Sequence, residues 1–119
     1  MGQAFKPIAL VVEDDPDQRE LLTVLLEEAE LHVFTCESAE AAIRILDKYG
    51  AGMSLLVTDV QLAGILTGAD LAQIAKQRYP ELSVVVTSGS AKPKLPADTV
   101  FMPKPWRALE ILKQAERTQ

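Results

Sequence analysis

The chain alternates between short apolar runs and longer stretches in which apolar residues recur at helical spacing. The short runs are rich in valine, and several of them are apolar at successive positions rather than at every second one. Continuous apolar runs of this length are typical of strands that are covered on both faces, as in a parallel sheet. The pattern therefore predicts strands at residues 8–12, 32–35, 55–58, 84–87 and 100–102.

The stretches between these runs have the signals of helix ends. Residues that commonly cap or begin helices precede the first three periodic stretches: Asp15 with Pro16, Ser38, and Thr67 or Gly68. Gly50 and Pro80 are suited to end the second and third helices, and Pro105 is predicted to begin a last one.

Strands that alternate with helices predict a parallel sheet wrapped by helices, with right-handed crossovers. One connection breaks the alternation, because Pro93 and Pro96 divide residues 87–100 and leave room for little more than one helical turn. We therefore expect a loop before the fifth strand. In folds of this kind the site lies beyond the carboxyl ends of the strands, so the residues at those ends are the candidates for function.

Composition and charge narrow the class of protein. A chain of 119 residues with 48% hydrophobic and 24% charged residues is typical of one soluble globular domain. No apolar run approaches the roughly 20 residues that span a bilayer, so we expect no membrane segment. The net charge of −5 argues against binding to a nucleic-acid backbone. The single cysteine, Cys36, excludes an internal disulfide and fits a cytoplasmic location, and with His32 as the single histidine, Cys-His or Ser-His catalysis is not expected.

Carboxylates crowd the end of the first predicted strand, where Glu13, Asp14, Asp15 and Asp17 fall within five positions. A helix start explains Asp15 and Asp17, because capping and the helix dipole favour each by roughly 0.3–1 kcal/mol. A helix start does not explain Glu13 and Asp14. These two carboxylates lie side by side, where repulsion and partial burial would raise the pKa of at least one of them. A hard divalent cation such as Mg²⁺ removes that penalty. Taken alone, the cluster leaves a solvated turn and a cation site equally open.

Asp59, Thr87 and Lys104 follow the ends of three other predicted strands. Each has an ordinary explanation, as a turn aspartate, a strand-end hydroxyl and a solvated lysine. Each also suits phosphoryl chemistry, as a nucleophilic carboxylate, a hydroxyl aimed at a phosphoryl oxygen and a phosphate-binding cation. The Lys104–Pro105 bond is a candidate for the cis form. Because all these residues fall at the edge where such folds place their sites, coincidence explains the set poorly.

Taken together, the stretches "LVVEDDPDQR", "LLVTDVQL", "VVVTSG" and "FMPKPW" make the chain resemble the receiver domains of two-component response regulators over essentially its whole length. The resemblance implies a flavodoxin-like α/β fold, a doubly wound five-stranded parallel sheet in the order 2-1-3-4-5. In this chain we expect the fourth helix to be shortened or replaced by a loop. Because the chain stops just after the last predicted helix, we also expect residues 1–119 to form a single receiver domain without an output domain.

The resemblance assigns a phosphoacceptor and a metal site. It implies that Asp59 takes the phosphoryl group and that Asp14 binds Mg²⁺ directly. Glu13 would reach the ion through water, and the backbone carbonyl of Gln61 would complete the protein's share of the ligands. Asp59 itself belongs to the same set of metal ligands.

The resemblance also assigns the residues that sense the phosphoryl group. Thr87 would be the switch hydroxyl, Phe101 would occupy the aromatic switch position, and Lys104 would contact the phosphoryl group. Gln61 and Gly89 would tune the rate of autodephosphorylation. The only reaction expected of such a domain is its own phosphorylation and dephosphorylation, so we do not expect a turnover enzyme.

The expected partners follow from the same resemblance. His32 lies in the second predicted strand, away from the candidate edge, so the phosphodonor histidine must belong to a histidine kinase or a histidine phosphotransfer protein. A downstream protein would then recognise the phosphorylated surface. Many relatives dimerise through the helix that is short here, and its loss leaves a monomer or a weak dimer as the expectation. The chain also has Ala63 where many relatives have proline, in a loop one residue longer than the most familiar version, and Phe101 replaces a frequent tyrosine.

Other interpretations remain beside the stand-alone receiver. The chain is also consistent with a receiver excised from a hybrid histidine kinase, and with a pseudo-receiver that binds a partner without phosphorylation. A haloacid-dehalogenase-type phosphohydrolase would need a second aspartate two residues after Asp59, where this chain has Gln61. A flavodoxin-like cofactor binder would need a phosphate-binding loop where this chain has Glu13 and Asp14.

Overall fold

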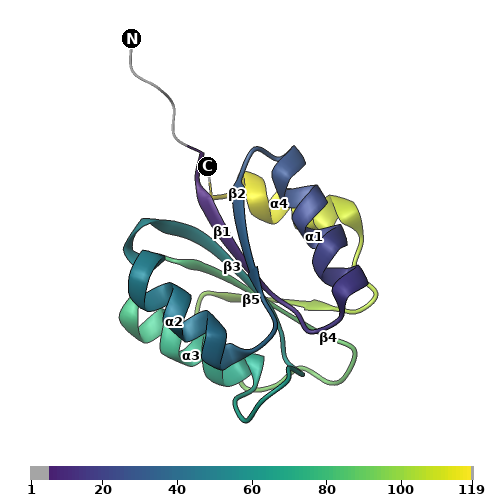
Figure 1. The fold of residues 1–119 in the computed structure, drawn as a ribbon. Coiled ribbons are helices and arrows are strands. Elements are labelled where there is room, and N and C mark those ends of the chain that lie inside the picture. The colour runs from purple at the N-terminus through teal and green to yellow at the C-terminus, as the bar shows by residue number, and fades with distance from the viewer. Residues whose placement is uncertain (1–5, 119) are drawn as a thin grey trace.

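The described part of the chain, residues 6–118 of the computed structural model, contains a five-stranded parallel sheet with the order β2-β1-β3-β4-β5 (Figure 1). The predicted fold class and strand order are therefore confirmed. The strands are β1 (Ile8–Val12), β2 (His32–Cys36), β3 (Met53–Asp59), β4 (Ser83–Ser88) and β5 (Thr99–Pro103). All the predicted strands are present, and every one except β1 extends one or two residues beyond a predicted end.

The described residues also form four α-helices: α1 (Pro16–Glu28), α2 (Ala39–Tyr49), α3 (Gly68–Arg78) and α4 (Ala108–Glu116). A short 3-10 helix, η1 (Gly50–Gly52), follows α2. The side chains of Asp15, Ser38 and Thr67 accept hydrogen bonds from first-turn amides of α1, α2 and α3, as predicted. Among the described residues, no helix is both long enough and apolar enough to cross a membrane.

The last helix begins at Ala108, so the prediction that it begins at Pro105 was wrong. Arg107 is extended, with φ −97° and ψ 148°. Its amide donates a hydrogen bond of 2.8 Å to Oε1 of Glu110, which reaches back from the first turn. This capping contact sets the start of the helix after Arg107.

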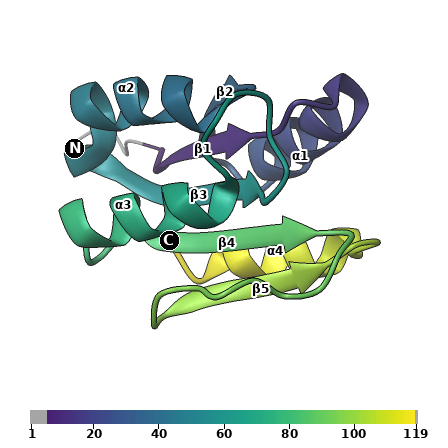
Figure 2. The same ribbon diagram turned by 90° about the horizontal axis from the view of Figure 1, so that it is seen from below.

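The helices cover the two faces of the sheet in pairs, with α2 and α3 on one face and α1 and α4 on the other (Figures 1 and 2). The fully buried residues of β1 alternate between these two cores. Leu10 and Val12 belong to the core beneath α2 and α3, whereas Ala9 and Val11 belong to the core beneath α1 and α4. Burial on both faces is the reason that this strand is apolar at successive positions.

The chain passes from β4 to β5 through residues 89–98 without forming a helix, as predicted. Leu95 from this connection and Phe101 from β5 are partly buried, and both pack against the core on the α2–α3 side. A loop therefore covers this part of the sheet where the alternation of strands and helices would place a helix.

Hydrogen bonds hold the chain in place beyond the carboxyl ends of the strands. The amide of Glu13 donates to the carbonyl of Cys36 at 3.0 Å, and the amide of Lys104 donates to the carbonyl of Ser88 at 2.8 Å. The segments that leave β1 and β5 therefore stay beside their neighbours past the ends of the strands. This arrangement positions the candidate side chains at one edge of the sheet.

Candidate functional site

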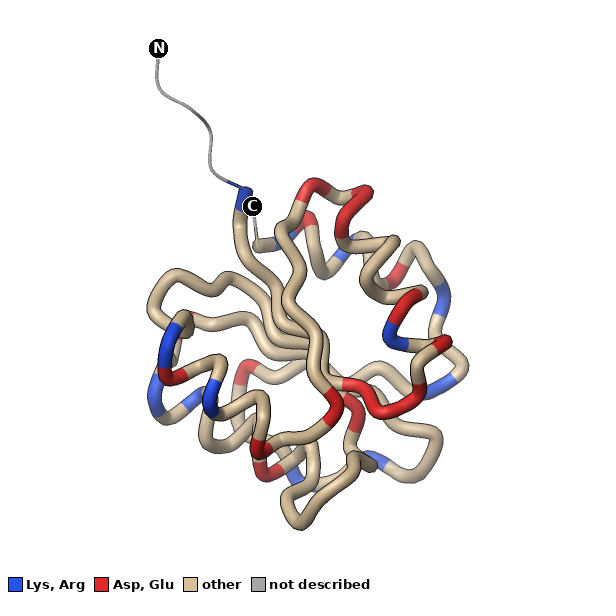
Figure 3. Tube along the Cα trace, in the orientation of Figure 1, with Lys and Arg blue, Asp and Glu red and all other residues tan. Residues whose placement is uncertain are grey.

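Three carboxylates meet at the carboxyl edge of the sheet. Glu13 and Asp14 follow β1, and Asp59 ends the neighbouring strand β3. One oxygen from each of these side chains lies within 4.8 Å of the others. Acidic segments accordingly gather beside the ends of the central strands in Figure 3. The structure thus brings together residues that lie 45 positions apart in the sequence.

The three carboxylates differ in their access to solvent. Glu13 is 1% exposed and Asp59 is 9% exposed, whereas Asp14 is exposed. Burial raises the pKa of Glu13 above its ordinary value, and the charge of Asp59 acts in the same direction. The amide of Asp15, which donates to Oε2 of Glu13 at 3.2 Å, and the nearby Lys104 oppose this rise in pKa without cancelling it. Negative charge at this position is therefore held at a cost that a cation would relieve.

Lys104 supplies one positive charge to this cluster. Its Nζ donates to Oδ2 of Asp59 at 2.9 Å and to Oε1 of Glu13 at 3.4 Å. Partial burial acts to lower the pKa of Lys104, but the hydrogen bonds and charges of Asp59 and Glu13 outweigh it, so the pKa lies above its ordinary value. The following bond, Lys104–Pro105, is cis. Lys104 is thus a charged lysine aimed at the acidic cluster rather than at solvent.

Thr87 is buried in β4, and its register partner in β3 is Asp59. Its carbonyl accepts the amide of Val60 at 2.9 Å, which joins the end of β4 to the chain just after Asp59. Phe101 lies in β5 opposite Val86, one position before the partner of Thr87, and is partly buried. Thr87 therefore lies directly beside Asp59 in the sheet, and Phe101 lies one strand further away.

Gln61 lies two residues beyond Asp59, in the loop of residues 60–67 that connects β3 to α3. Its side chain is exposed. The donor set at this edge consists of carboxylate oxygens, with backbone carbonyls in the adjacent loop. Oxygen donors of this kind suit a hard cation such as Mg²⁺, which commonly takes one or two protein carboxylates and keeps several waters. The residues present therefore fit a magnesium ion.

Two contacts at this edge could not be predicted from the sequence. Arg19 in α1 donates through Nη1 to the carbonyl of Glu13 at 2.9 Å and pairs with Glu37 at 3.3 Å, so it holds the main chain of Glu13. Gly68, at the start of α3, packs directly against the carbonyl of Asp59. Both contacts depend on where the helices sit relative to the strand ends.

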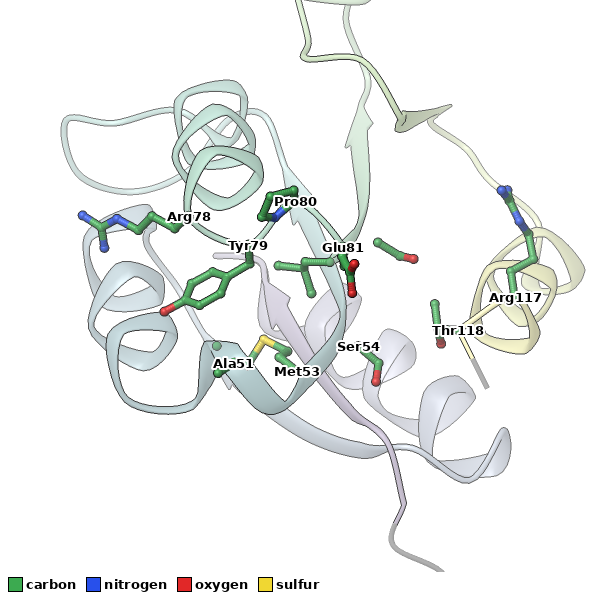
Figure 4. A pocket seen from close by; sticks show the side chains of 12 residues that line it. Ala51, Met53, Ser54, Arg78, Tyr79, Pro80, Glu81, Arg117 and Thr118 are labelled. Carbon is green, nitrogen blue, oxygen red and sulfur yellow. The ribbon is translucent and has the colours of Figure 1, made fainter.

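A separate cavity of about 560 Å³ lies at the opposite edge of the sheet, near the amino ends of β3 and β4 (Figure 4). Its lining includes Met53, Arg78, Tyr79, Glu81 and Arg117. Arg78 is paired with Asp47 on α2. The cavity lies away from Asp59 and Lys104, so we assign the chemistry to the carboxyl edge.

The comparisons with known proteins agree on one family. The family model of the response regulator receiver domain matches residues 9–114. The response regulator receiver protein CpdR of Brucella abortus (strain 2308) is 29% identical over 114 residues, which cover 91% of this chain and 92% of that protein.

Solved structures extend this similarity to the fold. A response regulator receiver protein from Sinorhizobium medicae WSM419 superposes with a TM-score of 0.87 at 22% identity, covering 95% of this chain and 94% of that one. A CheY-like receiver domain protein from Methanospirillum hungatei JF-1 gives a TM-score of 0.85 at 18% identity, covering 95% and 93%. At such identities the two structures establish a shared fold.

Proposed function

The chain belongs to the family of response regulator receiver domains, and on this premise we propose that it accepts a phosphoryl group on Asp59. The donor would be the phosphohistidine of a histidine kinase or a histidine phosphotransfer protein. Residues 1–119 would act as one receiver domain in the cytoplasm, and a downstream protein would recognise the phosphorylated surface. The observation that carries the proposal is the contact between Lys104 and Asp59 inside a cluster of carboxylates.

The proposed reaction is an in-line transfer. An oxygen of Asp59 bonds to phosphorus as the P–N bond of the donor breaks, and the electron pair of that bond goes to the imidazole nitrogen. Lys104, whose Nζ lies 2.9 Å from Oδ2 of Asp59, is positioned to balance the incoming charge. That charge is about −1.5 to −2 at neutral pH, as for other phosphorylated side chains.

Mg²⁺ is the proposed cofactor. Glu13, Asp14 and Asp59 would hold it together with the backbone carbonyl of Gln61, with Glu13 acting through water. When bound, the ion neutralises charge on the phosphoryl oxygens. The support for this part of the proposal is the oxygen-rich donor set and the raised pKa of the buried Glu13.

Thr87 and Phe101 are the proposed switch. Thr87 would turn its hydroxyl towards the phosphoryl group, and Phe101, one register position away in β5, would change its packing in response. Residues 89–98 form a loop between β4 and β5, so we propose a monomer or a weak dimer rather than a dimer built on a helix at this place. The net charge of −5 supports a protein partner rather than nucleic acid.

Acetyl phosphate tests the proposal directly. Intact-mass spectra of the chain incubated with acetyl phosphate and Mg²⁺ should show one added phosphoryl group. The Asp59→Asn variant should show none, and the signal should disappear when Mg²⁺ is removed by chelation. Asp17→Asn is the matched control, because Asp17 is exposed on α1, and it should be modified like the wild type.

The experiment can also refute the proposal. A wild-type protein that gains no phosphoryl group from acetyl phosphate or from a competent histidine kinase would refute the phosphoacceptor role. It would leave the pseudo-receiver, which binds a partner without phosphorylation, as the better account. Phosphorylation would not distinguish a stand-alone receiver from one that belongs to a hybrid histidine kinase, and a phosphotransfer profile against candidate kinases addresses that question.

A further inference from the structure

Glu40, in the first turn of α2, holds the loop that follows Asp59. Its Oε2 accepts hydrogen bonds from the amides of Ile65 and Leu66, each at 3.1 Å. These partners lie 25 and 26 positions further along the chain, in the loop of residues 60–67. A single carboxylate oxygen therefore ties the start of α2 to the connection between β3 and α3.

The geometry around Glu40 is close-packed. Among the described residues, its second oxygen, Oε1, is buried without a hydrogen-bond partner. Gly64 has φ +94°, and a Cβ at that position would lie 2.6 Å from Oε1 of Glu40. A parallel bridge between Ser38 and Ala63 joins the same two segments. The amide of Leu66 is the main cause that lowers the pKa of Glu40, which is the direction expected when amides bind a carboxylate.

The two ends of the loop are anchored to the site itself. The amide of Val60 donates to the carbonyl of Thr87 at 2.9 Å, and the amide of Gly68 donates to the carbonyl of Val60 at 2.8 Å. Gln61 lies between this anchor and the part of the loop that Glu40 holds. The position of the Gln61 carbonyl therefore depends on both attachments.

We propose that Glu40 is a positioning residue for the phosphorylation site, which fixes the loop of residues 60–67 and thereby the main chain that follows Asp59. Glu40 is not one of the carboxylates of the acidic cluster, and it has no proposed role in binding the phosphoryl group. It acts through the amides of Ile65 and Leu66, which set where the Gln61 carbonyl lies. This inference rests on the proposed function, because it concerns the geometry of that same site.

Three variants test it. Glu40→Ala removes the accepting oxygen, and Glu40→Gln keeps an accepting oxygen without the charge. Glu28→Gln is the matched control, because Glu28 is exposed at the end of α1.

Three quantities are measured on each variant of the 119-residue chain. They are amide hydrogen exchange at Ile65 and Leu66 by NMR, the Mg²⁺ concentration that half-saturates the change in fluorescence of Trp106, and the rate of phosphorylation by acetyl phosphate. Trp106 is the single tryptophan and lies two positions after Lys104, so its fluorescence should report Mg²⁺ binding.

We expect Glu40→Ala to speed exchange of the two amides by about tenfold or more, because hydrogen bonds to a charged acceptor are lost. The half-saturating Mg²⁺ concentration should rise by about tenfold, the lower end of the effect of removing a group that orients metal ligands. Phosphorylation should slow accordingly. Glu40→Gln should recover part of each loss, and Glu28→Gln should match the wild type.

A fourth variant, Gly64→Ala, disturbs the same contact without removing Glu40 and so covers the case in which Glu40→Ala folds poorly. A Cβ at this position would lie 2.6 Å from Oε1 of Glu40, and φ +94° strains any side chain there, so both effects should displace the loop and disturb Mg²⁺ binding. Where Glu40→Ala folds, that background removes the clash with Oε1 and keeps the backbone strain, so the added effect of Gly64→Ala should be smaller than in the wild type.

Two outcomes would overturn the inference. In the first, Glu40→Ala speeds amide exchange but leaves Mg²⁺ binding and phosphorylation unchanged, so that Glu40 only orders the loop. In the second, amide exchange is unchanged. If the wild type takes up no phosphoryl group, the proposed function fails, while amide exchange and Mg²⁺ binding still decide the role of Glu40.

Discussion

Gly68→Ala is the substitution that should disturb the site most directly without removing any of its chemical groups. Gly68 begins α3, and its amide donates to the carbonyl of Val60 at 2.8 Å. A Cβ on Gly68 would lie 1.8 Å from the carbonyl oxygen of Asp59 and 2.7 Å from its carbonyl carbon. The new methyl group would therefore press on the main chain of the proposed phosphoacceptor.

The size of the effect follows from these distances. Real Cβ atoms essentially never come within 3.0 Å of another heavy atom of this kind, so the backbones of Gly68 and Asp59 must separate by about 1.2 Å, the difference between that limit and 1.8 Å. Overpacking of this kind costs about 1–3 kcal/mol of unfolding free energy. At about 4 °C per kcal/mol, the Tm should fall by roughly 4–12 °C. A shift of about 1 Å at a reacting group also slows a reaction on the order of 100-fold.

Two assays measure these effects separately. Thermal unfolding followed by circular dichroism gives the change in Tm, and phosphorylation by acetyl phosphate below that Tm gives the change in rate. Gly52→Ala is the matched control, because among the described residues no heavy atom beyond its own chain neighbours lies within 4 Å of a Cβ at Gly52, and it should change neither quantity. A Gly68→Ala protein that unfolds and is phosphorylated like the wild type would refute the idea that close packing of Gly68 positions the main chain of Asp59.

Two further predictions concern the charges at the site. Asp14→Ala should abolish the Mg²⁺-dependent change in Trp106 fluorescence, because it removes a proposed ligand, whereas Asp17→Ala should cost only about 0.3–1 kcal/mol of helix stability. Equal effects of these two substitutions on Mg²⁺ binding would contradict the division of the acidic segment into a helix start and a metal site. Lys104→Ala should make the Tm more dependent on Mg²⁺ than in the wild type. Lys104 pairs with both Glu13 and Asp59, so without it Mg²⁺ would have to relieve the repulsion between these carboxylates. Melting curves with and without Mg²⁺ measure this, and an equal Mg²⁺-induced gain in both proteins would count against it.

The edge that gathers the candidate residues was predictable because it depends on the fold class rather than on detailed packing. In a parallel sheet every strand ends at the same edge, so residues that follow apolar runs, such as Asp59 and Lys104, are brought together once the strands are located. Helix starts were predictable for a similar reason, since Asp15 needs only its own local sequence to cap α1. The start of α4 was not, because Glu110 reaches back to Arg107 and outweighs the preference of Pro105 for a first helical position.

The contacts that hold the site could not be predicted from the sequence. Glu40 and Leu66 are 26 positions apart, and nothing in either local sequence indicates that they meet. Gly68 looks like an ordinary helix start, and its lack of a side chain matters only because α3 approaches the carbonyl of Asp59. Such contacts depend on the distances between helices and strand ends, which hydrophobic patterns do not determine.

Asp15 connects the start of α1 to the proposed metal site, the two features that share the acidic segment. Its side chain accepts the amide of Asp17 at 2.9 Å and so begins α1, while its own amide donates to Oε2 of Glu13 at 3.2 Å. The other oxygen of Glu13 faces Lys104 at 3.4 Å. The start of α1 therefore helps to fix how Glu13 presents its carboxylate to the proposed metal site. Changes at the helix cap should for this reason reach the site through the main chain of Asp15, even though the side chain of Asp15 is not a proposed metal ligand.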